Sequence, residues 1–424
     1  MSPLSTRRKS HLSGFRNLPS NFVIRTTSAS SYSTDDKTSF HQSPPRVVDV
    51  RQRHNAAARR ARLSDDPPMS PPTPTTPLRE LSASSAVADV STDGAFARKA
   101  STFRASFGDG PNDGAHPPVG NRYELVVSLA CPWACRALAT MALRGLDDAI
   151  AVRVTHPVWA RTRPGDEADT HSGWVFVDDA SRAQPSPSGR GAFVATNSDA
   201  CGPEGVKSVR ELYEMVDAPK EQRFTVPVVW DTVTKTIVNN ESSEIIRELN
   251  DPKWNAVAKN PDVDLYPAEL REEIDAVNAW VYEKINNGVY KCGFAVSQSA
   301  YDEAVDALFD ALDECERILS RRRYIAGNVL TEADVRLFQT LIRFDEVYVV
   351  YFKTNKKFIH QYEHLSGYVR ELYQMDALRA SVDMNHIKYH YFASHPSLNV
   401  HAIVPAGPNV DLFAPHGRDG AYPR

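Results

Sequence analysis

The sequence of 424 residues predicts an α/β domain followed by an all-α domain, both preceded by a disordered N-terminal tail. Three observations support this prediction. Residues 1–95 are rich in Ser, Thr, Pro and Arg and show no apolar periodicity. Strand-like and helix-like segments alternate over residues 96–255. Apolar residues then recur with helical spacing over residues 265–395, before a Pro- and Gly-rich C-terminal extension at 396–424.

The composition excludes several classes of protein. A net charge of −4 provides no global field for nucleic acid. Five unevenly spaced cysteines do not suggest a disulfide scaffold, so a reducing compartment is expected. No apolar run approaches the roughly 20 residues of a membrane span.

The tail carries two basic segments. Residues 1–34 contain Arg, Lys, Ser and Thr but no acid, which is typical of a mitochondrial or chloroplast transit peptide and also of an ordinary disordered tail of a cytoplasmic protein. Residues 46–62 are Arg-rich without aromatic residues, which fits a nucleic-acid or import patch or a solvated run. Residues 67–77 form a proline-rich linker, and the disorder is expected to end near residues 94–96.

The first folded segment places a cysteine at the start of a helix. Residues 123–129 are apolar and β-branched, which predicts a buried strand. Cys131 follows, then Pro132, which is tolerated in a first helical turn. The unpaired N–H groups and the dipole at a helix N-terminus stabilise a thiolate, which attacks disulfides and thioethers. Cys131 is therefore a candidate redox thiol, the alternative being a buried core cysteine.

The next segments complete the α/β domain. A strand is expected at 149–155, followed by a long polar stretch to Lys207. This stretch carries Trp174, which either belongs to a functional site or anchors the loop. A helix is expected at 206–216.

A proline interrupts the strand-like run 223–231. Proline deletes a donor from the ladder, so we expect either a cis Val226–Pro227 bond, which leaves the Val226 backbone free for a peptide-like ligand, or an ordinary trans edge proline. A strand at 236–240 and a helix at 241–250 with an Asn or Ser cap follow, and the N-terminus of that helix is an anion site. The order βαβ, loop and helix, then ββα, with these landmarks, is thioredoxin-like.

The second domain is expected to contain only helices, one of which opens with Thr331 as its cap and Asp334 three residues later, a variant of the capping box. The helical segments are 270–289, 300–319, 333–349, 358–374 and 382–392.

Several motifs together resemble the glutathione transferase superfamily, and more closely its glutathionyl-hydroquinone reductases, the Xi class. The resemblance extends from about Phe96 to the C-terminus. The motifs are Cys131-Pro-Trp-Ala, Gly173-Trp174, Arg223-Phe-Thr-Val226-Pro227-Val-Val-Trp-Asp, Asn239-Asn-Glu241-Ser242-Ser-Glu-Ile-Ile-Arg, Ile285-Asn-Asn-Gly-Val-Tyr290, Leu330-Thr-Glu-Ala-Asp, Arg343-Phe-Asp-Glu-Val-Tyr348 and His386-Ile-Lys-Tyr-His-Tyr391.

The resemblance implies a glutathione site and a homodimer. Cys131 would be the nucleophile, Tyr290 would donate a proton, and Tyr348 and Tyr391 would line the site and favour the thiolate. Glutathione, the co-substrate, has two carboxylates and an ammonium, which suit an arginine, a helix N-terminus and a glutamate. The residues implied to bind it are Trp174, Arg223, Phe224, Thr225, Val226, Glu241 and Ser242.

The implied activity is glutathione-dependent reduction of S-glutathionyl-hydroquinones through a Cys131–glutathione mixed disulfide. Two alternatives remain open. One is an omega-like thioltransferase or dehydroascorbate reductase, and the other is a redox-sensing, glutathione-binding protein without turnover.

Four further residues bear on these alternatives. Cys135 stands where the family usually has His, and it is a buried passenger, a resolving thiol or an off-switch. Cys292 lies two residues past Tyr290, within possible reach of the pocket, but nothing local activates it. His386 and His390 have metal-ligand spacing without a further ligand, so no metal is expected.

Overall fold

The computed structural model describes residues 100–108, 116–178, 182–219 and 222–422. The predicted tail, with its transit peptide, basic run and proline-rich linker, lies outside these residues. Among the described residues, no helix is both long and apolar enough to cross a membrane.

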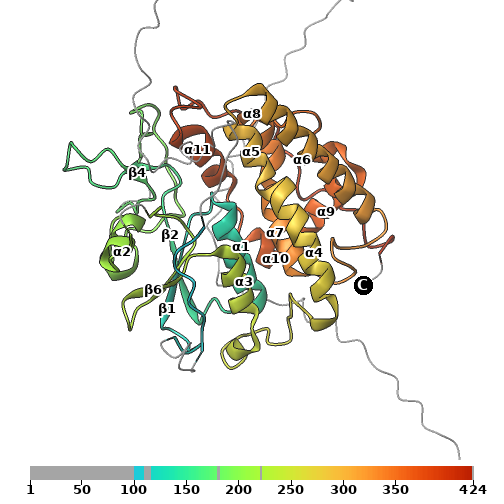
Figure 1. Cartoon of the computed structure of the whole chain (residues 1–424), viewed down its shortest axis with the longest axis horizontal. Coiled ribbons are helices and arrows are strands. Elements are labelled where there is room, and N and C mark those ends of the chain that lie inside the picture. Colours follow the sequence, from blue (N-terminus) through green and yellow to red (C-terminus); the bar gives the residue numbers. More distant parts are fainter. Residues whose placement is uncertain (1–99, 109–115, 179–181, 220–221, 423–424) are drawn as a thin grey trace, which may run out of the picture. The chain divides into compact units, whose positions relative to one another are not determined.

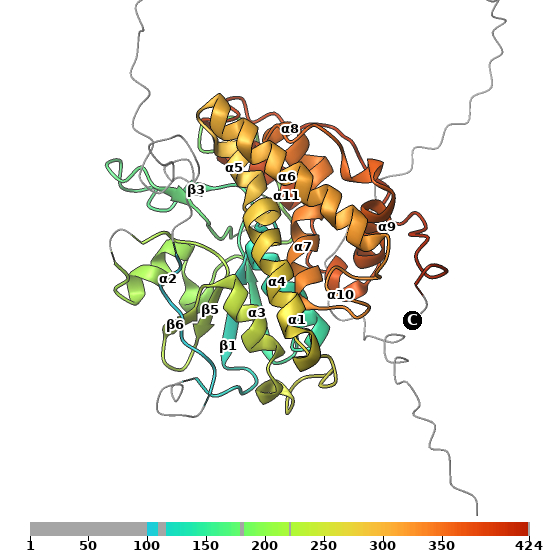
Figure 2. The ribbon, with the colours of Figure 1, turned by 45° about the vertical axis from the view of Figure 1, so that its right-hand side comes forward.

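The first half of the described chain is a four-stranded sheet with helices on both faces, which confirms the α/β prediction (Figure 1). The strands run in the order β2-β1-β5-β6; β1 pairs in parallel with β2, and the other two pairings are antiparallel. Helices α1 and α3 lie on the face toward the helical half, and α2 lies on the other side of the sheet (Figures 1 and 2). The elements are β1 (Tyr123–Val127), α1 (Pro132–Arg144), β2 (Ile150–Val154), α2 (Val209–Met215), β5 (Val228–Asp231), β6 (Thr236–Asn239) and α3 (Ser242–Asn250).

Three local predictions in this half need correction. The strand β1 ends at Val127, so three residues turn the chain before Cys131. The long polar stretch carries a short hairpin of β3 (Ala160–Arg161) and β4 (Ser172–Gly173), which its polar sequence conceals. The cap of α3 is Glu241 rather than Asn or Ser, because the Glu241 carboxylate accepts the N–H of Ser243 at 3.0 Å.

The second half is all-helical, as predicted, but two of its helices are interrupted by π-helical turns. The segment expected as one helix over 270–289 divides at η6, and the segment over 333–349 divides at η7. The elements are η4 (Pro252–Trp254), η5 (Ala268–Leu270), α4 (Arg271–Val281), η6 (Tyr282–Asn286), α5 (Gly288–Phe294), α6 (Gln298–Leu319), α7 (Glu332–Arg343), η7 (Phe344–Tyr348), α8 (Val349–Tyr351), η8 (Ile359–Gln361), α9 (Glu363–Tyr373), α10 (Asp376–Arg379) and α11 (Met384–Ser394).

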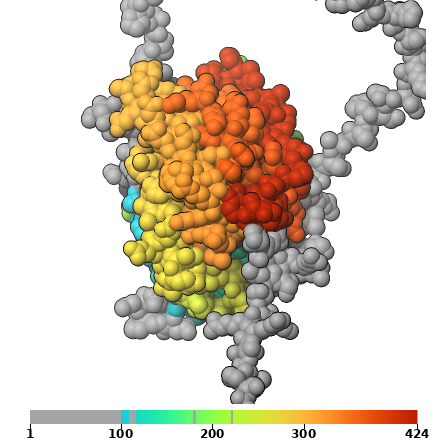
Figure 3. Space-filling model, turned by 90° about the vertical axis from the view of Figure 1, so that its right-hand side faces the viewer, coloured from blue at the N-terminus to red at the C-terminus, as the bar shows by residue number. Residues whose placement is uncertain are grey.

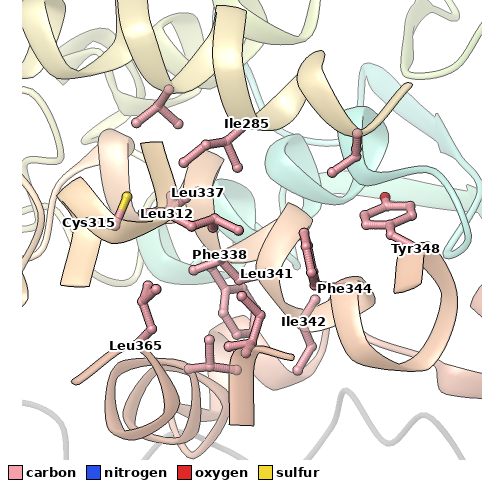
Figure 4. Close-up of a cluster of buried hydrophobic side chains, with 14 of the residues drawn as sticks. Ile285, Leu312, Cys315, Leu337, Phe338, Leu341, Ile342, Phe344, Tyr348 and Leu365 are labelled. Atoms are coloured by element: carbon pink, nitrogen blue, oxygen red, sulfur yellow. The ribbon is translucent and has the colours of Figure 1, made fainter. Parts of the chain in front are cut away.

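Helix α7 is the centre of the helical half. Its residues are buried along its whole length, and apolar side chains from α6 and α9 pack against it (Figure 4). The predicted capping box is confirmed at its start, where the Thr331 N–H donates to the Asp334 carboxylate at 2.9 Å. Because α7 also contacts α1, its C-terminal end approaches the start of the first helix of the α/β half.

The C-terminal extension lies on the surface of the helical half (Figure 3). Arg418 donates to the buried carboxylate of Glu371 at 2.7 Å, and Arg323 donates to the same carboxylate at 2.7 Å. A buried carboxylate shared by two guanidinium groups anchors the extension, because removing either partner leaves a buried charge poorly compensated.

A second buried carboxylate supports the sheet. Asp231, at the end of β5, accepts hydrogen bonds from Arg122 at 2.6 and 2.9 Å and lies 2.8 Å from His116 Nδ1. Burial alone would raise the pKa of Asp231, but these hydrogen bonds outweigh it and hold the pKa well below its ordinary value.

We expect Asp231→Asn to lower the free energy of unfolding at pH 7 by about 3–5 kcal/mol, because it removes the completely buried carboxylate that pairs with the mostly buried Arg122 guanidinium. Since the folded-state pKa is depressed, this stabilisation is complete above the unfolded value of about 3.9 and is lost as the pH falls through the folded value. Urea unfolding of the wild type and the variant, at pH 7 and at lower pH, measures this difference in the free energy of unfolding. Asp306→Asn, at an exposed ion pair with Lys356, should change stability by less than about 1 kcal/mol; an equal loss in both variants would contradict the prediction.

Candidate active site

One cavity of about 430 Å³ is lined by the start of α1, the loop before β5, the start of α3, and helices α5 and α11. It contains nearly all the residues predicted for the site, although they come from segments far apart in the sequence. The predicted residues that line it are Cys131, Trp174, Arg223, Phe224, Thr225, Val226, Glu241, Ser242, Tyr290 and Tyr391.

Cys131 occupies the position expected from the sequence. It is the N-cap of α1, with extended backbone angles, and Pro132 follows in the first turn. Its side chain is a thiol outside any disulfide, mostly buried, and its Sγ lies 3.7 Å from the carbonyl oxygen of Val226. The thiol therefore faces the cavity at a helix N-terminus, the position that favours a thiolate.

The polar wall of the cavity lies beside the sheet. The Val226–Pro227 peptide bond is cis, the first of the two alternatives left open by the sequence, and Val226 lies before the ladder, since β5 begins at Val228. Glu241 and Ser242 stand at the start of α3. Ser101, which no sequence motif singles out, donates a hydrogen bond to the Glu241 carboxylate at 2.9 Å. This wall combines a carboxylate, a guanidinium and backbone groups. Together they suit a peptide that carries both an ammonium and carboxylates.

Trp174 is part of an aromatic cluster. Its ring stacks on His390 with centroids 4.5 Å apart and meets Trp159 edge-on at 5.6 Å. Trp159, His390 and His395 also line the cavity and were not predicted to do so: the sequence singles out His390 only through its spacing from His386, and it assigns no role to the other two. Burial lowers the pKa of His390 well below its ordinary value and that of His395 to about 4, so both are neutral at pH 7.

The histidines do not form a metal site in the described part of the chain. His390 Nδ1 lies 3.0 Å from the Pro157 carbonyl oxygen, and His386 Nε2 lies 3.9 Å from the Asp383 carboxylate, beyond hydrogen-bond distance. Within the described residues, no group of three or more His, Cys, Asp or Glu side chains is placed to hold a metal ion.

Three tyrosine hydroxyls form a chain that begins in the cavity. Tyr290 and Tyr391 lie 2.7 Å apart through their hydroxyl oxygens, and Tyr391 and Tyr348 lie 3.0 Å apart. The prediction that Tyr348 lines the site is wrong, because Tyr348 is completely buried and packs in the helical core (Figure 4). Burial raises the pKa of Tyr348 and Tyr391 well above the ordinary value, so both hydroxyls stay protonated and able to donate.

The other candidate thiols do not reach the cavity. Cys135 is completely buried, and its Sγ lies 3.3 Å from the Leu129 carbonyl oxygen and 3.2 Å from a guanidinium nitrogen of Arg343. Burial raises the pKa of Cys135 to about 11, and that of Cys292 to about 12. Both are free thiols, and Cys292 packs in the helical core. Cys131 is therefore the thiol of this set that is placed to react with a ligand in the cavity.

A larger cavity of about 560 Å³ lies elsewhere, between α7, α9, α11 and the C-terminal extension. None of the predicted site residues lines it, so the chemistry points to the smaller cavity.

Two family models match the chain. The model described as "Glutathione S-transferase, N-terminal domain" matches residues 130–251, and the one described as "Glutathione S-transferase, C-terminal domain" matches residues 298–371. The first range holds Cys131 and Glu241, and the second holds Tyr348.

The chain is also similar to characterised proteins along most of its length. It is 42% identical to the glutathionyl-hydroquinone reductase YqjG of Escherichia coli (strain K12), over 78% of this chain and 94% of the relative. It is 40% identical to the glutathionyl-hydroquinone reductase PcpF of Sphingobium chlorophenolicum, over 76% of this chain and 92% of the relative.

Solved structures agree with these similarities. The crystal structure of the glutathione-S-transferase Xi from Phanerochaete chrysosporium matches with a TM-score of 0.67 and 42% identity, over 77% of this chain and 96% of that one. The glutathione-bound structure of YqjG from Escherichia coli K-12 matches with a TM-score of 0.67 and 41% identity, over 76% of this chain and 97% of that one.

Proposed function

The chain belongs to the glutathionyl-hydroquinone reductases, the Xi class of the glutathione S-transferases, and from this membership we propose that it reduces S-glutathionyl-hydroquinones to hydroquinones with glutathione as co-substrate. The observation that carries the proposal is that a thiol at a helix N-terminus shares one cavity with tyrosine hydroxyls. A thiol alone suits disulfide exchange, whereas a carbon–sulfur bond also needs a proton for the departing carbon.

We assign the polar wall of the cavity to glutathione. Glu241 pairs with the ammonium of the γ-glutamyl group, and Arg223 pairs with a carboxylate. Ser242 and the N–H groups at the start of α3 receive the γ-glutamyl carboxylate, because a helix N-terminus favours an anion. The backbone of Val226 pairs with the peptide part, beside Phe224 and Thr225, and Trp174 closes the wall.

The first half of the reaction breaks the carbon–sulfur bond. The Cys131 thiolate attacks the sulfur of the glutathionyl-hydroquinone, and a sulfur–sulfur bond forms as the ring carbon departs with the bonding electrons. Tyr290 protonates that carbon, and the hydrogen bond from Tyr391 stabilises the phenolate left on Tyr290. Hydroquinone leaves, and a Cys131–glutathione mixed disulfide remains.

The second half restores the enzyme. A second glutathione attacks the mixed disulfide as a thiolate, oxidised glutathione leaves, and Cys131 returns as a thiolate. The proton of that glutathione thiol returns to Tyr290. The sum is one glutathionyl-hydroquinone and one glutathione converted to one hydroquinone and one oxidised glutathione.

We expect Glu241→Gln to weaken glutathione binding by about 10- to 100-fold, because a charge-assisted hydrogen bond contributes about 1.5–3 kcal/mol. Isothermal titration of glutathione into the protein measures the dissociation constant. Glu244→Gln is the matched control, since it removes the same charge in the same helical turn but from a pair with Arg104 outside the cavity. Equal binding by the Glu241 and Glu244 variants would refute the assignment of Glu241.

The test of the function is turnover of glutathionyl-menadione by the full chain with excess glutathione. Formation of free menadiol and oxidised glutathione in equal amounts is the expected result. Mixed-disulfide exchange on Cys131 without menadiol would favour the omega-like thioltransferase or dehydroascorbate reductase activity. A stable mixed disulfide with no turnover of any substrate would favour a redox sensor.

We further propose a homodimer and import of the chain into a mitochondrion or chloroplast. Family membership supports the first proposal, and the basic, acid-free composition of residues 1–34 supports the second. Light scattering of the purified protein tests the dimer. The N-terminal sequence of the protein recovered from its cell compartment tests import and cleavage.

A further inference from the structure

Arg343 is a completely buried cation whose hydrogen bonds all go to neutral acceptors. One guanidinium nitrogen donates to the backbone and side-chain oxygens of Gln339, at 2.7 and 2.9 Å. The other donates to the Leu129 carbonyl at 3.2 Å and to Cys135 Sγ at 3.2 Å, and Nε donates to the Ala130 carbonyl at 3.3 Å. The donors of the guanidinium are thus occupied, but no carboxylate compensates its charge.

This lack of a counter-ion differs from the pattern elsewhere in the helical half. The buried guanidinium groups of Arg323 and Arg418 share the carboxylate of Glu371. Among the ion pairs of residues 100–108, 116–178, 182–219 and 222–422, none involves Arg343. Carbonyl dipoles and the C-terminal end of α7 offset part of the charge, yet a buried cation normally has an anionic partner.

The position of Arg343 indicates which anion can serve as its counter-ion. Leu129 and Ala130 directly precede Cys131, and Cys135 is one helical turn beyond it. The guanidinium therefore lies behind the first turn of α1 and donates hydrogen bonds to the backbone that directly precedes the reactive cysteine. It reaches there from α7, on the helical half of the molecule.

The groups that face Arg343 leave its charge available. Cys135 stays a neutral thiol because burial raises its pKa to about 11. The hydroxyls of Tyr348 and Tyr391 stay protonated and His390 stays neutral. Asp383, whose charge acts on Cys135, accepts hydrogen bonds from the Asn197 side chain and the N–H of His386. The charge of Arg343 also acts on Cys135, Tyr290, Tyr348, Tyr391 and His390, none of which is a carboxylate.

We propose that Arg343 is a positioning residue that holds the Leu129–Ala130 backbone and supplies the positive charge against which Cys131 ionises. The inference rests on the proposed function, in which Cys131 reacts as a thiolate. The Cys131 thiolate is then the counter-ion of the buried guanidinium. Cys135 accepts a hydrogen bond from the guanidinium but, as a neutral thiol, does not neutralise its charge. A guanidinium fixed by neutral acceptors suits this task, because its charge needs no rearrangement when the thiolate forms.

The test measures the ionisation of Cys131 without any quinol substrate. The rate of Cys131 alkylation by iodoacetamide is followed from pH 4 to 10 by mass spectrometry of its peptide, in the full chain. We expect Arg343→Gln to raise the midpoint by about 1–2 pH units, because an opposite charge nearby lowers a thiol pKa by that order. Arg343→Lys should stay within about 0.5 of the wild-type midpoint, because it keeps the charge.

Two variants of Cys135 keep the test decisive if Arg343→Gln does not fold. Cys135→Asp places a carboxylate on the guanidinium and should raise the midpoint by about 1 unit, whereas Cys135→Ser should leave it unchanged. An unchanged midpoint in a folded Arg343→Gln or Cys135→Asp protein, or equal shifts for the Lys and Gln variants, overturns the inference. The proposed function fails separately, if wild-type protein with a normal Cys131 midpoint does not release menadiol.

Discussion

Replacing Cys131 by serine should lower turnover of glutathionyl-menadione by about 10⁴-fold or more, the scale of loss when an enzyme loses its nucleophile. Serine preserves the size of the side chain at the N-cap of α1, but its hydroxyl does not ionise at pH 7 and cannot form the mixed disulfide. Steady-state assay of menadiol, with mass spectrometry for a glutathione adduct on the protein, measures both losses.

Cys135→Ser is the matched control for this result. It removes the other thiol of the same helix, which is buried away from the cavity, and should leave turnover within about threefold of wild type. Turnover that survives in Cys131→Ser would remove Cys131 from the mechanism. Turnover that is lost in Cys135→Ser, in a protein that unfolds like wild type, would show that Cys135 is more than a passenger.

Tyr290→Phe should slow release of the hydroquinone by about 10²- to 10³-fold, because a positioned general acid contributes on that scale. The second half of the reaction, reduction of the mixed disulfide by glutathione, should keep its rate, since no carbon is protonated in it. Single-turnover mixing of the enzyme with glutathionyl-menadione measures the first half. Mixing the preformed mixed disulfide with glutathione measures the second.

Tyr348→Phe separates proton donation from support of the donor. Tyr348 lies behind Tyr391 and has no access to the cavity, so its loss removes one hydrogen bond from the chain of hydroxyls. We expect a decrease of less than about tenfold, corresponding to the net value of one such bond. A decrease as large as that of Tyr290→Phe would mean that the chain acts as one unit, and equal slowing of both half-reactions would contradict the role of Tyr290.

The parts of this site that the sequence predicted are those where local chemistry has few solutions. Cys131 before Pro132 marks a helix start after a buried strand, and a proline inside an apolar run marks an interrupted strand at Pro227. Thr331 and Asp334 mark a capping box within four residues. In each case the signal and the structure lie within one turn of chain.

The parts that were missed depend on contacts across the sequence. Tyr348 was predicted at the cavity wall, but the π-helical turn η7 and the packing of Tyr391 place it one layer deeper. Ser101 reaches Glu241, and Arg343 reaches Ala130, over separations that periodicity does not encode. The cap of α3 was assigned to Asn or Ser because those residues lead the statistics, although the longer Glu241 side chain reaches the same N–H.

The two reacting groups belong to different halves of the molecule, since Cys131 starts α1 while Tyr290 and Tyr391 stand on α5 and α11. Along the chain, Cys131 and the polar wall that ends at Ser242 precede Tyr290 and Tyr391. A chain that ends before α5 would keep Cys131 but would lack both Tyr290, the source of the proton for carbon, and Arg343, the cation behind the first turn of α1. The helical half thus supplies the step that distinguishes cleavage of a carbon–sulfur bond from general thiol exchange. Separation of this half from the sheet would change which reaction occurs as well as its rate.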